Sequence, residues 1–108
     1  MPNFVRVCAL EDIPLGEMRR LDLEDGPGIV IIRAANGLVS ALQDRCSHGE
    51  FPLSDGYLEG ELLECPLHGA KFCVRTGRPQ TPPATLAVER HDVKIEDGNV
   101  YVDTQPAL

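Results

Sequence analysis

The sequence lacks any hydrophobic run long enough to cross a bilayer. Its longest aliphatic run covers residues 29–32, whereas a membrane-spanning helix needs about 20 apolar residues. The opening residues, 1–14, contain no apolar core of the kind that a secretory signal peptide carries. We therefore expect a soluble protein of the cytoplasm.

Positive charge is also scarce. The chain has 10 Lys and Arg against 17 Asp and Glu, which gives a formal net charge of −7. Nucleic acid and anionic membrane surfaces repel a protein with this charge, so we expect neither as a partner. A basic protein surface is the complementary partner.

The sequence also has no internal repeat, low-complexity tract or linker. Its 108 residues, 43% hydrophobic and 25% charged, have the composition of an ordinary globular protein. A chain of this length is just long enough to bury a single core without staples. We expect one domain over residues 1–108, ordered apart from its ends.

No segment shows a convincing helix of two turns. Only 10–18 suggests a helical turn, and Pro14 interrupts it. Short alternating or β-branched segments recur instead, at 4–8, 29–33, 38–42, 71–74, 88–96 and 100–103. The turn sequences at 35–37 and 97–99 join neighbouring segments as tight hairpins. The pattern predicts an all-β sandwich or barrel in which 46–69 forms loops.

Cysteine and histidine are rare in this chain but gather in one stretch. Three of the four cysteines and two of the three histidines lie within 43–73. In the cytoplasm, cysteines are more often metal ligands or buried thiols than disulfides. Cys46-x-His48 and Cys65-x-x-His68 stand sixteen residues apart. Each of two loops can therefore supply two donors to one metal centre.

The order of these ligands favours a binuclear iron centre. Structural zinc sites with two cysteines and two histidines more often take both cysteines from one loop and both histidines from a helix. A mixed pair in each loop suits a cluster in which one iron binds both thiolates and the other binds both imidazoles. A zinc-stabilised interaction module is the alternative.

The motif resembles the signature of the Rieske [2Fe–2S] family, C-x-H followed by a spacer of this length and C-x-x-H. The similarity extends over Gly49, Pro66, Gly69, the segment 71–79 and the prolines at 82–83. It implies the Rieske fold, an antiparallel β-sandwich with a small cluster-binding subdomain of two ligand loops at about 44–73. It also implies one [2Fe–2S] cluster per chain, ligated by Cys46, His48, Cys65 and His68.

The resemblance implies a further set of residues around the cluster. Gly49 and Gly69 lack a Cβ, so their backbone N–H groups can approach the inorganic sulfides. The proline loop is expected to lie against the cluster. The complete shell is Gly49, Pro66, Leu67, Gly69, Ala70, Phe72, Pro82 and Pro83.

Departures from the high-potential members of the family indicate a low reduction potential. Those members carry an extra cysteine in each loop, where this chain has Phe51 or its neighbours and Leu67. They also carry Ser and Tyr hydroxyls that donate to sulfur, where this chain has Ala70 and Phe72. Without these hydrogen bonds, we expect a potential of about −150 mV, the low end of the Rieske range.

The segment 44–65 is similar to low-potential soluble Rieske ferredoxins. That resemblance implies an electron carrier between a flavin-dependent reductase and a terminal aromatic-ring dioxygenase. The chain has no nucleophile–base pair and is too short for a second domain with a mononuclear iron, so we expect no catalytic residues. We expect a monomer that docks its partners through Phe51, Leu67 and Pro83. The alternative is the Rieske-like small subunit of an assimilatory nitrite reductase.

Other polar and thiol residues have simpler interpretations. Cys8 and Cys73 lie in apolar strand-like segments, so we expect buried packing thiols. His91 is expected as a partly exposed surface side chain. The acidic residues near the motif form either a solvated face or part of a docking surface; they are Glu50, Asp55, Glu59, Glu61 and Glu64.

Overall fold

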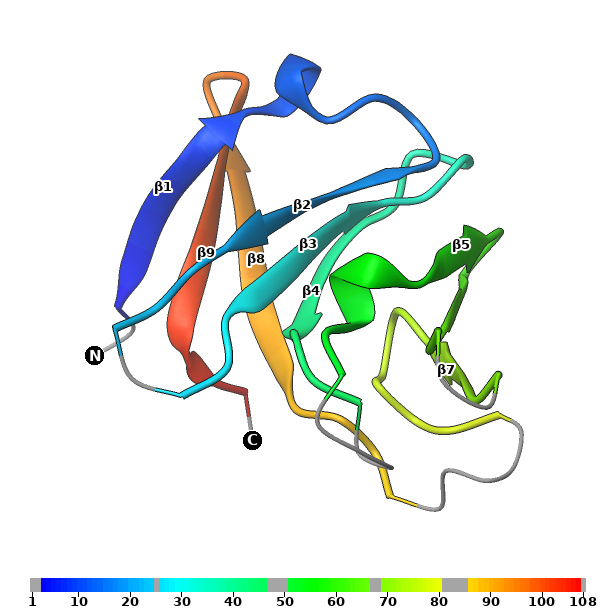
Figure 1. Cartoon of the computed structure of the whole chain (residues 1–108). Helices are drawn as coiled ribbons and strands as arrows, with labels where there is room; N and C mark the ends of the chain where they lie inside the picture. The colour runs from blue at the N-terminus through cyan, green and yellow to red at the C-terminus, as the bar shows by residue number, and fades with distance from the viewer. Residues whose placement is uncertain (1–2, 25, 47–50, 67–68, 81–85, 108) are drawn as a thin grey trace.

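The computed structural model describes residues 3–24, 26–46, 51–66, 69–80 and 86–107, and it is built from antiparallel strands (Figure 1). The strands are β1 (Phe4–Ala9), β2 (Glu17–Leu21), β3 (Ile29–Arg33), β4 (Val39–Gln43), β5 (Tyr57–Glu59), β6 (Leu62–Glu64), β7 (Lys71–Cys73), β8 (Arg90–Glu96) and β9 (Asn99–Pro106). Two short 3-10 helices, η1 (Leu10–Asp12) and η2 (Leu53–Asp55), complete the elements. The predicted all-β fold is confirmed.

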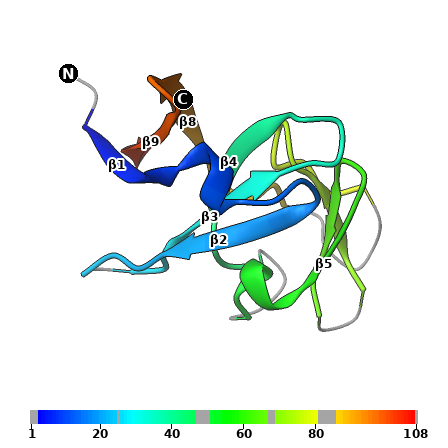
Figure 2. The same cartoon turned by 90° about the horizontal axis from the view of Figure 1, so that it is seen from above.

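The strands form a large sheet and a small one. The large sheet has the order β1-β9-β8-β4-β3-β2, and the small sheet has the order β5-β6-β7. All of the strand pairs are antiparallel. Two views at right angles both place the small sheet beside β3 and β4 and away from β1 (Figures 1 and 2). In the described part of the chain, no helix is long and apolar enough to cross a membrane.

Strand β3 separates two apolar clusters. Ile29 and Ile31 pack into one cluster with residues of β1 and β9, whereas Val30 and Ile32 pack into the other. Because successive side chains of a strand point to opposite faces, β3 must be apolar at both positions of the repeat. This explains the continuous aliphatic run at 29–32, whose four side chains are all fully buried.

Both predicted hairpin turns are confirmed. In the first, the N–H of Gly37 donates to the carbonyl of Ala34 at 2.9 Å, between β3 and β4. In the second, Asp97 and Gly98 have φ values of 53° and 75°, the left-handed pair that a tight β8–β9 turn requires. The helical turn expected at 10–18 is present only as η1, which ends before Pro14.

Three strands were missed from the sequence. β2 carries Glu17, Arg19 and Arg20, so its polar and apolar residues alternate little. Pairing with the apolar β3 holds it as a strand. β5 and β6 have three residues each and lie within 46–69, which was predicted as loops. That prediction was wrong there because strands this short show no readable period.

The prediction for His91 was also wrong. This side chain is only 5% exposed, because β8 pairs with β4 on one side and with β9 on the other. Its Nδ1 lies 2.8 Å from the carbonyl oxygen of Asp103, which satisfies one ring nitrogen. Cys8 is buried as predicted, and this burial raises the pKa of its thiol. Cys73 is only partly buried.

Gly56 follows η2 and packs against the end of β6. The chain that leaves the first cysteine loop therefore lies beside the start of the second cysteine loop. A Cβ at Gly56 would lie 2.0 Å from the carbonyl oxygen of Glu64. Gly56→Ala should therefore lower the free energy of unfolding by about 2–3 kcal/mol, measured by urea denaturation. Gly60→Ala is the control, because nothing lies within 4 Å of its Cβ position and only its φ of +59° is strained, at about 1 kcal/mol. Equal losses would show that the close approach is unimportant.

Candidate metal centre

Cys46 and Cys65 are buried in the same apolar cluster. They are 2% and 1% exposed, and neither forms a disulfide. Cys46 follows β4, and Cys65 directly follows β6 in the small sheet. Both pack with Leu53, Leu63 and Phe72, among others, in the cluster between the two sheets. The fold thus brings two cysteines from separate loops to one dry site.

One equivalent backbone hydrogen bond lies inside each cysteine loop. The N–H of Cys46 donates to the carbonyl of Phe51 at 2.9 Å, and the N–H of Cys65 donates to the carbonyl of Ala70 at 2.7 Å. In each loop the acceptor stands five positions after the cysteine. His48 and His68 fall inside these two closures but lie outside the described residues. The part of the site that is described fits a group held by two thiolates.

The predicted shell is only partly described. Ala70 and Phe72 are fully buried in the apolar cluster that contains both cysteines, as a shell around the site requires. Pro66, next to Cys65, is exposed. Gly69 has a φ of +71°, which glycine adopts without strain, so backbone conformation is a second reason for glycine there. Gly49, Leu67, Pro82 and Pro83 lie outside the described residues.

Phe51 has two separate features at the first loop. Its carbonyl oxygen closes the loop by accepting from Cys46. Its aromatic side chain is 45% exposed, which is unusual for a phenylalanine. Among the predicted docking residues, Phe51 is described and exposed, whereas Leu67 and Pro83 are not described.

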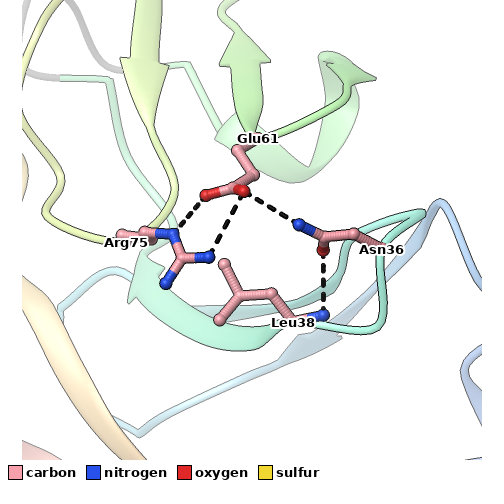
Figure 3. A network of polar contacts seen from close by, with 4 residues as sticks. All are labelled: Asn36, Leu38, Glu61 and Arg75. Carbon is pink, nitrogen blue, oxygen red and sulfur yellow. Dashed lines mark hydrogen bonds and ion pairs between the residues drawn. The ribbon is translucent and has the colours of Figure 1, made fainter.

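Glu61 has a structural partner set (Figure 3). Its carboxylate accepts from Arg75 and from the side-chain amide of Asn36, the latter at 2.9 Å. Hydrogen bonding to Arg75 holds the pKa of Glu61 below its usual value. The network ties the β5–β6 turn to the β3–β4 turn and to the segment after β7. Glu61 therefore belongs to the link between the sheets.

The other acidic residues near the motif differ among themselves. Glu64 lies 3.9 Å from Lys71 across the β6–β7 pair. Asp55 and Glu59 are exposed. Glu50 lies outside the described residues. Asp55 and Glu59 have the exposure that both predictions require, the solvated face and the docking surface.

Sequence reasoning missed Asp44, two positions before Cys46. Its side chain is fully buried, with an exposure of 0%. The carboxylate accepts from both the backbone N–H and the hydroxyl of Ser54, each at 2.7 Å. Arg20 of β2 lies 3.4 Å from it. No sequence signal could have found this group, because its partners lie on two other elements.

The family model for the Rieske [2Fe–2S] domain matches residues 3–95. The chain therefore belongs to the Rieske [2Fe–2S] family, and its cofactor is one [2Fe–2S] cluster. The zinc alternative is set aside by this result.

Two further matches show which class of Rieske protein the chain resembles. The chain is 42% identical over 102 residues to the ferredoxin component of biphenyl 2,3-dioxygenase from Rhodococcus jostii (strain RHA1), with 94% of each chain covered. It superposes with a TM-score of 0.93 on a chain of the solved complex of reduced oxygenase and oxidised ferredoxin in carbazole 1,9a-dioxygenase, at 33% identity. That match covers 97% of this chain and 96% of the other. These similarities define an electron carrier, not an enzyme.

The nitrite reductase alternative has weaker support. A solved structure of a putative NADH-dependent nitrite reductase small subunit from Mycobacterium tuberculosis has a TM-score of 0.85. It covers 100% of this chain and 99% of its own, but only 18% of the aligned residues are identical. That similarity shows the common fold and nothing further about function.

The ligand assignment predicts a sharp difference among the four cysteines. Cys46→Ala or Cys65→Ala should abolish cluster assembly, because each removes one of the two proposed thiolate ligands. Cys73→Ala and Cys8→Ala are the matched controls and should leave assembly unchanged. Iron and acid-labile sulfide per chain, with the visible absorption spectrum, measure the outcome. Normal loading of Cys46→Ala would refute the assignment.

Ala70 and Phe72 allow a test of the low potential. Ala70→Ser and Phe72→Tyr each place a hydroxyl in the buried cluster beside the cysteines, and a donor to sulfur stabilises the reduced state more. Each should raise the midpoint potential by on the order of 20–60 mV, the one-electron equivalent of a hydrogen bond worth about 0.5–1.5 kcal/mol. Redox titration monitored by absorbance gives the value. Two loaded variants with unchanged potentials would contradict this explanation.

Proposed function

We propose that this chain is the ferredoxin component of an aromatic-ring dioxygenase system. It carries single electrons from a flavin-dependent reductase to a terminal oxygenase. The observation that carries this proposal is the similarity to a dioxygenase ferredoxin component over 94% of both chains. Cys46 and Cys65 support it, because both are buried in one apolar cluster and neither forms a disulfide.

The chain's own residues hold the cofactor and control its surroundings. When bound, the cluster supplies a one-electron redox couple. Cys46 and Cys65 provide two thiolates from a dry apolar site, and His48 and His68 complete the ligand set. The thiolates balance the 2+ charge of an oxidised core, whereas neutral imidazoles add no negative charge. The missing hydroxyls at Ala70 and Phe72 keep the potential at the low end.

The docking face is proposed at the end of the molecule where the two cysteine loops emerge. Phe51 and Pro66 are exposed there, and Asp55 and Glu59 are exposed nearby in sequence. An apolar centre with an acidic rim suits a small interface that must release quickly. The net charge of −7 would steer encounter with a basic patch on each partner. Leu67 and Pro83 belong to the same proposed face.

The proposed setting follows from this role. A carrier that meets two partners in turn is best served as a monomer, and we propose the cytoplasm as its compartment. The terminal oxygenase selects the aromatic substrate. The two similar proteins are named for biphenyl and for carbazole systems, so we propose an aromatic ring compound as the substrate class.

Phe51 gives the clearest test of the docking face. Phe51→Ala should slow electron delivery to reductase and oxygenase roughly fivefold, because it removes an aromatic anchor of the interface. The spectrum and midpoint potential should not change, since only the side chain is truncated. Stopped-flow reduction and single-turnover transfer to the oxygenase measure the rates. Raising the salt concentration should slow the wild type.

Ile95→Ala is the matched control. Ile95 is 43% exposed, close to the 45% of Phe51, and lies on β8 near the β8–β9 turn. The register places Arg90 of β8 beside Leu42, so Ile95 is at the far end of that strand from the cysteine loops. Equal rates for Phe51→Ala and wild type would place the interface elsewhere.

A further inference from the structure

The two cysteine loops are closed at their bases by different means. The second loop is the connection of a β-hairpin, because Glu64 and Lys71 pair directly across β6 and β7. The bond from Cys65 to Ala70 continues this ladder toward the loop. Backbone pairing therefore fixes where the second loop begins and ends.

The first loop has no such ladder in the described residues. It leaves the large sheet after β4, which ends at Gln43, and returns into the 3-10 helix η2. Besides the inner bond from Cys46 to Phe51, a side-chain contact closes this loop in the described residues. Asp44 Oδ1 accepts from the backbone N–H of Ser54, and Asp44 Oδ2 accepts from the Ser54 hydroxyl, both at 2.7 Å.

Asp44 is itself held from two sides. Its N–H donates to the carbonyl oxygen of Gly28 at 2.8 Å, one step beyond the β3–β4 pairs. Arg20 Nε of β2 lies 3.4 Å from Oδ2 and 2.8 Å from the exposed carboxylate of Asp22. A fully buried carboxylate is costly unless hydrogen bonds and an opposite charge compensate it, and here both are present.

We propose that Asp44 is the positioning residue of the first cluster loop and that Ser54 is its counterpart. Together they close the base of the first loop, as the β6–β7 ladder closes the second, and they fix the span of the loop that carries Cys46 and His48. Without this clamp, the loop ends would be free to separate, and holding the ligands in place would cost more conformational entropy. The inference rests on Cys46 serving as a cluster ligand, but it requires neither proposed partner.

Ser54→Ala tests the clamp without changing any charge. The chain offers a control in Ser40→Ala, because Ser40 is a buried serine, 8% exposed, whose hydroxyl has no hydrogen-bond partner in the described structure, whereas Ser54 is half-buried and its hydroxyl is bonded. Loss of a hydrogen bond to a charged group should speed cluster loss to a chelator about tenfold for Ser54→Ala. Ser40→Ala should lose its cluster at the wild-type rate. Decay of the visible absorption gives both rates.

A spectroscopic readout separates positioning from general destabilisation. The EPR signal of the reduced Ser54→Ala protein should broaden, because a loosened loop holds its ligands in several arrangements. Ser54→Thr keeps both donors to Asp44 and should restore the wild-type line width and rate of cluster loss. Ser40→Ala should retain the wild-type signal even if its urea midpoint shifts.

Asp44→Asn gives an independent arm, with Asp22→Asn as its control, since both carboxylates pair with Arg20 but only Asp44 contacts Ser54. Asp44→Asn should accelerate cluster loss, and Asp22→Asn should not.

The inference is overturned if Ser54→Ala matches Ser40→Ala in both cluster loss and EPR line width, or if Asp44→Asn matches Asp22→Asn in cluster loss. None of these measurements involves the reductase or the oxygenase, so failure of the proposed function would appear separately, as absent electron transfer by an intact cluster protein.

Discussion

Cys46 and Cys65 must reach the same buried place from loops that leave different sheets. This requirement explains why the apolar cluster around them takes residues from both sheets, with Val30, Ile32 and Leu42 from one and Leu63 and Phe72 from the other. A thiolate ligand in a dry site needs close-packed walls, and the walls are the facing surfaces of the sheets. With Cys46 and Cys65 as the proposed ligands, sheet packing and metal binding depend on the same set of side chains.

The sequence predicted those parts of the fold that depend on local chemistry. The β3–β4 and β8–β9 hairpins follow from Asn and Gly at their turns, and the apolar run at 29–32 marks a strand buried on both faces. The ligand set of cysteines and histidines stays a prediction, made from ligand spacing, which is a local pattern. The short β5 and β6 were not readable, since their positions depend on pairing with a partner strand and on the contact of Gly56 with Glu64.

Errors and omissions share a physical origin in contacts distant along the chain. His91 looked like a surface residue because its neighbours Arg90 and Asp92 are charged, but β8 lies inside the large sheet and covers it. Asp44 looked like one more acidic residue in an acidic chain. Only the fold brings it to Ser54, ten positions later, and to Arg20 in β2. A buried charge with such partners leaves no periodic trace in the sequence.

The polar links add a restraint that the apolar cluster does not supply. Asn36, Glu61 and Arg75 join the two sheets at exposed turns, whereas Asp44 and Ser54 join the ends of the first loop. Apolar contacts are non-directional, so they set proximity but not orientation. Hydrogen bonds to charged groups are directional and stronger than neutral ones, so they set orientation. A ligand loop needs both, because its cysteine must be near the cofactor and must also point toward it.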